Sequence, residues 1–414
     1  MVSKVLKLGN RLLGSGASQV VLAQAVLALG SIIYSKVLAE FYPKELVGLY
    51  FEIVAVCGFG LLLVLAPFNQ YFTRKVTDDN PIDLYSFYVI CCIMSFLTAL
   101  VVSFFFNVSF YLIFLITIVS ALKDSTFSWF NQLRRRKMVL AFNFFYSFSR
   151  VLFLLIFTFF TITSLNFLIA SHMVGFLSVF LLGFYVYYRE RKKQYSIARL
   201  NSDVVNVFSL DSSKFIFPLV LTSLVSWSKE MGVRFIISIN MPPDDLAAYG
   251  LLSSLASMVP IFIQGVLTIY FIPKLYSNEM TYMKVMVRGL GVLLGLLIFS
   301  FLLFWYFNSQ LVAVFLSTDY LGYSYLLPYI LLSSTLFSAA NFVGVYFFYI
   351  RETYYLAIIG LISSLIILSL VWAATLYSQL SVVVYYLCLA MFCYLVISVV
   401  LVLLKWSKGR CKDV

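Results

Sequence analysis

The chain has 414 residues, of which 63% are hydrophobic and 11% are charged, and its formal net charge is +12. This composition excludes an ordinary water-soluble domain, because such a domain cannot bury so much apolar surface. Residues 84–122 and 353–404 contain no Lys, Arg, Asp, Glu or His at all. The basic residues alternate with apolar segments, so the positive charge does not indicate nucleic-acid binding, and no nucleic-acid partner is expected.

Twelve apolar segments are each long enough to cross a bilayer as a helix, which takes about 20 residues. Segments such as 151–160 are apolar on all sides, whereas a membrane β-barrel needs alternating polar and apolar residues, so helices are favoured. The sequence therefore predicts an all-α polytopic membrane protein. Its helices are expected at about 12–35, 46–70, 84–105, 109–130, 138–161, 165–188, 213–239, 246–272, 285–307, 322–349, 354–376 and 380–404.

The two halves of the chain resemble each other at an offset of 199 residues. Tyr71–Val76 matches Tyr270–Leu275, and the same offset relates Tyr50 to Tyr249. Six helices in each half give both halves the same orientation, so the repeat is parallel, as in some transporters. The predicted parts are an N-terminal six-helix lobe over 1–188, a connecting loop over 189–207 and a C-terminal six-helix lobe over 208–414.

The basic residues outside the predicted helices are distributed unevenly between the two sets of loops. The two termini and every second loop hold 22 Lys and Arg residues, whereas the opposite loops hold only Lys36 and Lys44. Cytoplasmic loops are enriched in Lys and Arg. Both termini and the loop 189–207 are therefore expected in the cytoplasm.

The predicted seventh helix carries the most charge. A charge at the centre of a membrane helix costs at least about 2.5–3.5 kcal/mol, so it normally faces a cavity or a partner. Glu230 and Arg234 are four residues apart and can pair on one helix face. Lys229 lies about 100° away from Glu230. Two interpretations stay open: a neutral pair with a Lys that extends to the membrane surface, or a cationic cavity wall.

Polar residues elsewhere suggest further parts of a site. In the first helix Gln24, Ser31 and Ser35 share a face, with the spacing of Ser223, Glu230 and Arg234 at the 199-residue offset. Such a stripe either joins helices or lines a cavity. Lys123 and Arg150 near helix ends either reach the headgroups or guard a substrate entrance. The candidate substrate-binding residues are Lys229, Arg234, Glu230, Lys214, Arg150, Lys123, Gln24 and Ser31.

Chemistry other than binding has little support in the sequence. His172 is the only histidine, and none of the six cysteines has metal-ligand spacing with it. Phosphate-binding loops and Ser-His-Asp sets are absent. No catalytic group, metal site or cofactor is therefore expected.

The stretch RLLGSGASQVVLAQAVLALGSIIYSKVLAEFYPKELVGLY, Lys214–Pro218, the charged seventh helix and Asp245–Tyr249 resemble the Wzx-type polysaccharide flippases. These belong to the multidrug/oligosaccharidyl-lipid/polysaccharide transporter superfamily. The resemblance implies a V-shaped fold of two lobes around a cationic central cavity. It also implies a role in O-antigen and lipopolysaccharide biosynthesis in the cell inner membrane. The expected substrate is an oligosaccharide linked to undecaprenyl diphosphate, carried outward by alternating access.

The partners expected from this resemblance are the lipid-linked oligosaccharide, membrane lipids, a coupling ion such as H⁺ or Na⁺, and polysaccharide polymerases. Two other functions remain open. An ion-coupled drug antiporter of the same superfamily needs a titratable acid, for which Glu230 is the candidate. Drug-extruding relatives keep an acidic residue in the first helix. In this chain the first helix has no acidic residue before Glu40, which disfavours an antiporter. A glycan polymerase or ligase usually has a long outward loop, and here the outward loops are short.

Overall fold

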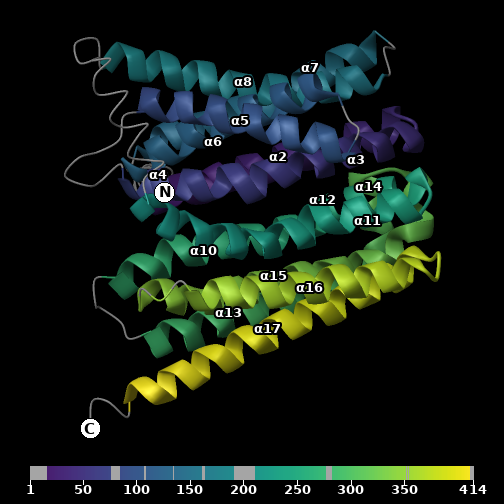
Figure 1. Ribbon diagram of the computed structural model, residues 1–414. Coiled ribbons are helices and arrows are strands. Elements are labelled where there is room, and N and C mark those ends of the chain that lie inside the picture. Colours follow the sequence, from purple (N-terminus) through teal and green to yellow (C-terminus); the bar gives the residue numbers. More distant parts are fainter. Residues whose placement is uncertain are drawn as a thin grey trace, which may run out of the picture. The chain divides into compact units, whose positions relative to one another are not determined.

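A computed structural model describes residues 16–75, 84–106, 109–133, 135–160, 164–190, 210–276, 282–350, 352 and 354–410. Every secondary-structure element in these ranges is a helix (Figure 1). The predicted all-α polytopic fold is confirmed. The elements in the first half are α2 (Gly16–Phe41), α3 (Lys44–Gly60), η1 (Leu61–Leu65), α4 (Ala66–Lys75), α5 (Leu84–Phe106), α6 (Phe110–Gln132), α7 (Arg136–Phe159) and α8 (Leu165–Glu190).

The second half of the chain begins with α10 (Leu210–Trp227), η2 (Ser228–Gly232) and α11 (Val233–Asn240), which follow one another without a break. The remaining elements are α12 (Pro243–Tyr276), α13 (Tyr282–Tyr306), α14 (Asn308–Phe315), η3 (Thr318–Leu326), α15 (Leu327–Tyr349), α16 (Tyr354–Thr375) and α17 (Leu380–Arg410). Of these, η1 and η2 are π-helical turns and η3 is a 3₁₀ helix. Residues 308–321 lay between two predicted helices, and α14 and the start of η3 occupy them.

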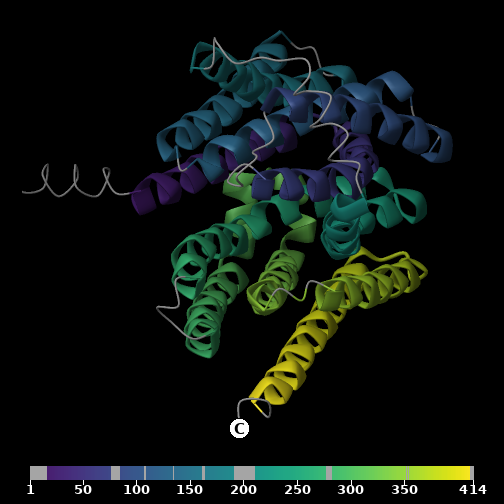
Figure 2. The same ribbon diagram turned by 60° about the vertical axis from the view of Figure 1, so that its left-hand side comes forward.

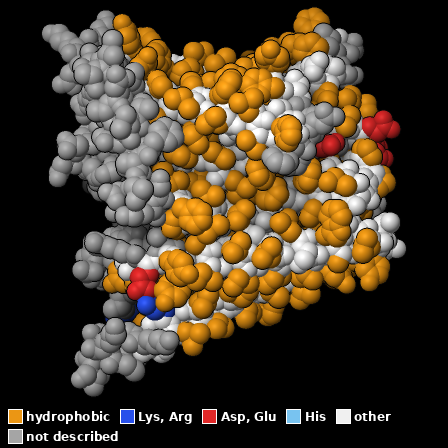
Figure 3. Space-filling view, viewed as in Figure 1, with side chains coloured by type: hydrophobic (Ala, Val, Ile, Leu, Met, Phe, Trp, Pro, Cys, Tyr) orange, Lys and Arg blue, Asp and Glu red, His pale blue; other side chains and the backbone are white. Residues whose placement is uncertain are grey.

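Eleven helices in the described part are long and apolar enough to cross a membrane. The predicted seventh helix, 213–239, corresponds to α10, η2 and α11, and it is not one of these eleven because of its charged residues. On the face shown in Figure 3, hydrophobic side chains dominate and the charged side chains in view lie near the edges. This surface is suited to contact with lipid.

The chain divides into two compact units, here called unit 1 and unit 2. Unit 1 comprises Met1–Tyr34 and Val56–Phe217, and unit 2 comprises Ser35–Ala55 and Pro218–Val414. The predicted boundary at 189–207 lies almost wholly outside the described residues, so it stays a prediction. Within the described part, Ser35–Ala55 groups with unit 2 rather than with the first half, because Lys44 Nζ donates to the carbonyl of Asp319 at 3.0 Å and Phe51 packs against Gly250.

Unit 1 is built from helices that run side by side in pairs, notably α5 with α6 and α7 with α8 (Figures 1 and 2). Aromatic rings fill its core: Phe72 stacks on Phe87 with ring centroids 3.7 Å apart. Buried polar groups join the helices, since the Tyr88 hydroxyl lies 2.7 Å from Thr126 Oγ1 and Asn143 Nδ2 donates to the carbonyl of Ala23 at 3.0 Å. In a bilayer such bonds hold helices together where water cannot compete for them.

Unit 2 is organised around α15, which packs against α17, α12 and α13 and is mostly buried. By contrast, α13 exposes most of its apolar side chains. Small residues allow close helix contacts in this unit. Gly360 on α16 lies directly against the backbone of Leu221 and Thr222 on α10. The position of α10, which leads into the charged turn η2, therefore depends on α16.

Candidate functional site

The charged helix changes its winding where its charges begin. Residues Ser228–Gly232 form the π-helical turn η2 between the α-helical segments α10 and α11. Lys229 and Glu230 lie inside this turn, and Lys229 is buried. A π turn accommodates one extra residue, and such turns occur frequently at functional sites. The turn therefore displaces Lys229 and Glu230 from the positions that a continuous α-helix would give them.

A cavity of about 120 Å³ lies beside this turn within unit 2. Its charged lining residues are Lys229, Glu230 and Arg234, two cations and one anion. Its other polar residues come from α12 and α15: Tyr249, Ser253, Ser254, Ser257, Ser333 and Ser334. Most of these hydroxyl groups already donate to helix carbonyls, as Ser254 does to Gly250 at 2.7 Å and Ser333 does to Ile330 at 2.8 Å. The cations are therefore the groups best able to meet a ligand.

Lys229 is held in the cavity wall without a counter-ion. Its side chain is 7% exposed, and its ammonium lies 5.0 Å from the centre of the Phe337 ring. No carboxylate in the described part lies within ion-pair distance of it. A buried ammonium without a hydrogen-bonded anion is costly, and a cation–π contact offsets only part of that cost. An anionic ligand in this cavity would supply the missing partner.

Arg234 is oriented by two other elements of unit 2. Its Nη2 donates to Ser253 Oγ at 3.1 Å, and its guanidinium lies 4.9 Å from the centre of the Phe51 ring. Its Nε is buried and has no hydrogen-bond partner in the described part. Arginine presents several N–H groups in a rigid plane, which suits it to bind phosphate or carboxylate oxygens. The guanidinium is thus held by Ser253 and Phe51, while its Nε–H is a buried donor that makes no hydrogen bond within the described part.

The ion pair predicted between Glu230 and Arg234 is not formed in the structure. Both residues line the same cavity, but they are not within ion-pair distance. The prediction assumed α-helical spacing, and Glu230 lies in the π turn while Arg234 follows it. Arg234 is also directed towards Ser253 and Phe51. The interpretation of a self-neutralised helix therefore loses its support.

A second, larger cavity of about 450 Å³ lies within unit 1. It is lined by Gln24 and Ser31 on α2 and by Lys123 on α6, all three of which the sequence had suggested. Asp124, next to Lys123, also lines it, and the lining residues that sequence reasoning missed are Leu27, Asn69, Phe127, Ser128, Asn131, Asn143 and Tyr146. Two residues of the polar stripe of α2, Gln24 and Ser31, therefore face a cavity, whereas Ser35 is buried outside it.

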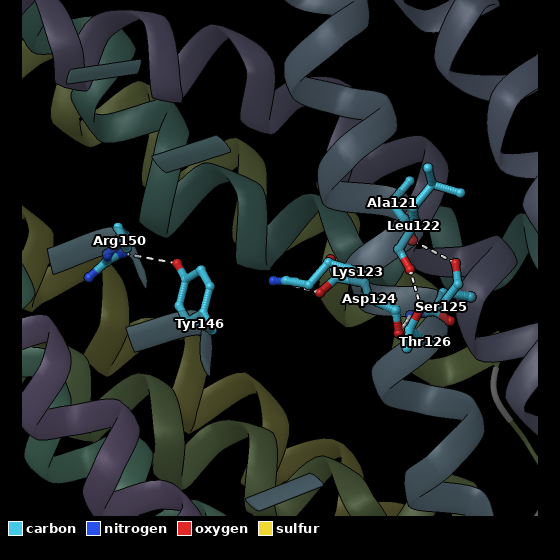
Figure 4. Close-up of polar contacts among 9 residues, drawn as sticks. Ala121, Leu122, Lys123, Asp124, Ser125, Thr126, Tyr146 and Arg150 are labelled. Carbon is cyan, nitrogen blue, oxygen red and sulfur yellow. Dashed lines mark hydrogen bonds and ion pairs between the residues drawn. The ribbon is translucent and has the colours of Figure 1, made fainter. Parts of the chain in front are cut away.

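Lys123 is neutralised by the residue beside it. Its ammonium lies 2.8 Å from Asp124 Oδ1, and it also faces the Tyr146 and Phe176 rings, with their centres 5.4 and 4.5 Å away. Figure 4 shows the Lys123 ammonium pointing towards Tyr146 from one side and Arg150 approaching Tyr146 from the other. The Lys123 ammonium therefore lies within unit 1, and together with Asp124 it adds no net charge to the described cavity lining.

Arg150 lies against aromatic rings and does not line the cavity of unit 1. Its guanidinium lies 3.9 Å from the centre of the Tyr34 ring, and Nη1 donates to the Tyr146 hydroxyl at 2.9 Å. Only 7% of its surface is exposed. Arg150 therefore reaches the cavity only through Tyr146, as a residue that positions this ring.

The structure separates the candidate residues into two sets. Lys229, Glu230 and Arg234 line the cavity of unit 2, and Gln24, Ser31 and Lys123 line that of unit 1. The side chain of Lys214 lies outside the described residues, although α10 includes this position. Asn69, Asn131 and Asn143 could have been found from their presence inside apolar helices, because burying an uncharged polar group there also costs free energy.

The fold is similar to that of solved membrane transporters. A multidrug resistance MATE family transporter of the MOP superfamily, in an inward-facing conformation, matches with a TM-score of 0.65 and 10% identity, over 94% of this chain and 96% of that chain. The lipid II flippase MurJ, in an inward closed conformation, matches with a TM-score of 0.68 and 15% identity, over 92% of this chain and 85% of that chain. The eukaryotic MATE transporter AtDTX14 matches with a TM-score of 0.63 and 14% identity, over 96% of both chains.

No protein-family model matches the chain. No curated protein matches it either. The comparison therefore rests on the structural neighbours. At identities of 10–15%, these neighbours show the fold alone. The chain is a multi-pass membrane protein whose fold is similar to that of the solved MATE transporters and of MurJ.

Proposed function

We propose that the chain is a flippase for lipid-linked oligosaccharides. In this proposal it moves undecaprenyl-diphosphate-linked repeat units from the cytoplasmic to the outer leaflet of the cell inner membrane, by alternating access, for O-antigen and lipopolysaccharide biosynthesis. The observation that carries the proposal is the buried cation Lys229, which lines a polar cavity with Arg234 and has no carboxylate of the described part within ion-pair distance. A diphosphate headgroup would offset the cost of burying these charges.

The proposal agrees with the fold in a further respect. Both a flippase for a lipid substrate and multidrug transporters are found among the structural neighbours. A sugar diphosphate is too polar to cross hydrocarbon unaided, so its transfer requires a polar path through the protein. The cavities of the two units supply polar surfaces of this kind. Polysaccharide polymerases would then receive the product at the outer leaflet.

Transfer can be measured directly in proteoliposomes. The undecaprenyl-diphosphate-linked glycan pool extracted from the source cells would be incorporated with the purified protein, and an impermeant lectin would report the outer-leaflet fraction. We expect lectin binding to rise with time only in vesicles that contain the protein. Equal binding in protein-free vesicles and in proteoliposomes would contradict the flippase function.

An ion-coupled drug antiporter is the second candidate, because Glu230 supplies an acidic residue in the cavity of unit 2. The two functions differ in their need for this carboxylate. In a flippase, Glu230→Gln removes a negative charge next to two cations, so we expect anion binding and export to be kept. In a proton-coupled antiporter, the same change would abolish transport and its dependence on the proton gradient. Transport measured with and without an imposed gradient distinguishes the two, with Glu230→Asp as the matched control.

The orientation in the membrane is a separate prediction. In a background without native cysteines, Ser196→Cys in the loop 189–207 should not react with an impermeant thiol reagent added to intact cells, because basic loops remain in the cytoplasm. Tyr377→Cys, in the predicted outward turn between α16 and α17, should react and serves as the control. Labelling of Ser196→Cys from outside together with protection of Tyr377→Cys would reverse the proposed topology.

A further inference from the structure

The described lining of the unit 1 cavity differs chemically from that of unit 2 because it carries no net charge. Among the described lining residues, Lys123 and Asp124 are the charged ones, and their side chains are paired at 2.8 Å. A free anion would therefore meet no unpaired cation on this wall. A small cation would find only one carboxylate, and that carboxylate already has a partner. The electrostatics of this cavity favour an uncharged ligand.

The wall offers many uncharged hydrogen-bonding groups. Gln24 and Ser31 from α2 and Ser128 and Asn131 from α6 line the cavity, and none of their side chains makes a hydrogen bond within the described part. Each amide presents two donors and an acceptor, and each hydroxyl both donates and accepts. Such groups match a ligand that carries several hydroxyl groups, because a hydroxyl also donates and accepts.

Two aromatic side chains complete this wall, and one of them is held firmly. Tyr146 and Phe127 line the cavity. The Tyr146 hydroxyl accepts a hydrogen bond from Arg150 Nη1, so its own proton remains available to a ligand. Its ring lies between Arg150 and the Lys123 ammonium (Figure 4). A fixed ring reduces the entropy lost when a ligand binds.

We infer that the cavity of unit 1 is a carbohydrate subsite, which binds the uncharged sugar part of the substrate through Gln24, Ser31, Ser128, Asn131 and Tyr146. The inference rests on the proposed function and adds to it a binding site in unit 1 for the sugar part of the substrate. The volume of about 450 Å³ lies within the range of about 300–1,000 Å³ that is usual for small-molecule sites. The positioning residue for the aromatic wall is Arg150, which bonds to Tyr146.

Two lipids that differ only in the sugar test this carbohydrate subsite. The purified full-length protein in lipid nanodiscs would be titrated with undecaprenyl diphosphate, and with the undecaprenyl-diphosphate-linked glycan pool from the source cells. In the Gln24→Leu/Asn131→Leu variant we expect the Kd for the glycan-linked lipid to rise roughly tenfold, because two hydrogen bonds are lost. The Kd for undecaprenyl diphosphate should not change. Gln132→Leu, next to Asn131 but outside the cavity lining, should change neither value.

A second measurement addresses the sugar alone. The oligosaccharide released from the lipid by mild acid should give saturation-transfer NMR signals with the wild-type protein, and these should disappear with the Gln24→Leu/Asn131→Leu variant. An equal loss of affinity for both lipids, or no change for either, would refute the carbohydrate subsite while leaving the flippase function standing. If the wild-type protein binds neither lipid, the proposed function fails and the subsite fails with it.

Discussion

Surface polysaccharide is expected to disappear when both Lys229 and Arg234 are replaced by alanine, although the protein still inserts into the membrane. These two cations are the groups in the cavity of unit 2 that can meet an anionic ligand. A hydrogen bond to a charged group contributes about 1.5–3 kcal/mol, so each single Ala variant should bind the diphosphate roughly 10- to 100-fold more weakly. Export in a strain that lacks the native gene, normalised to protein abundance in the membrane, measures the effect.

Charge-conserving variants separate the role of charge from the role of shape. Lys229→Arg should keep part of the export, because the charge remains although the geometry changes. Lys137→Ala is the matched control, since Lys137 is exposed on α7 and lines neither cavity. Normal export by both the Lys229→Ala and the Arg234→Ala protein, at normal abundance, would rule out a cationic binding wall.

Gly360→Ala is expected to cause a large loss of stability in unit 2. A Cβ at this position would meet the carbonyl oxygen of Leu221 and Cα of Thr222, and backbone atoms cannot rotate away. Helices α16 and α10 would have to separate, and overpacking of this kind costs about 1–3 kcal/mol or more. The midpoint temperature of the purified protein and its abundance in the membrane should both fall. Export should fall with them, because α10 leads into the turn that carries Lys229.

Gly291→Ala on α13 is the matched control. A Cβ at this position meets no atom within 4 Å. Alanine favours a helix over glycine by about 1 kcal/mol, so the control should be as stable as the native protein or slightly more stable. Equal stability of the Gly360→Ala and Gly291→Ala proteins would show that α10 and α16 do not need their close contact.

The membrane helices were predictable because their signal is composition. The helix expected over 165–188 is observed at Leu165–Glu190, and that expected over 354–376 is observed at Tyr354–Thr375. The segment after residue 307 was less predictable. There α14 and the 3₁₀ helix η3 precede α15, and both are too short to give a hydropathy signal. The helix expected from 322 therefore begins as a 3₁₀ helix and continues as α15.

The candidate site was only partly predictable, because charge is easier to see in a sequence than contact. Lys229 and Arg234 stand out as cations in an apolar segment, and the structure places both beside one cavity. The contacts of Arg234 with Ser253 and Phe51 join distant parts of the chain, and no local pattern indicates them. No sequence pattern indicates the π turn either. The spacing of an α-helix therefore predicted an ion pair of Glu230 with Arg234 that the structure does not form. The asparagines of the unit 1 cavity went unnoticed because they are neutral.

The charged seventh helix has a consequence for how the protein is made. Eleven helices of the described part are long and apolar enough to cross a bilayer, but α10, η2 and α11 together carry three charges between residues 229 and 234. Each charge costs about 2.5–3.5 kcal/mol at a helix centre, so this segment is a poor substrate for the insertion machinery by itself. Its neighbours α12 and α16 leave the ribosome later. The helix that carries the cations therefore depends, during synthesis, on sequence that has yet to be translated.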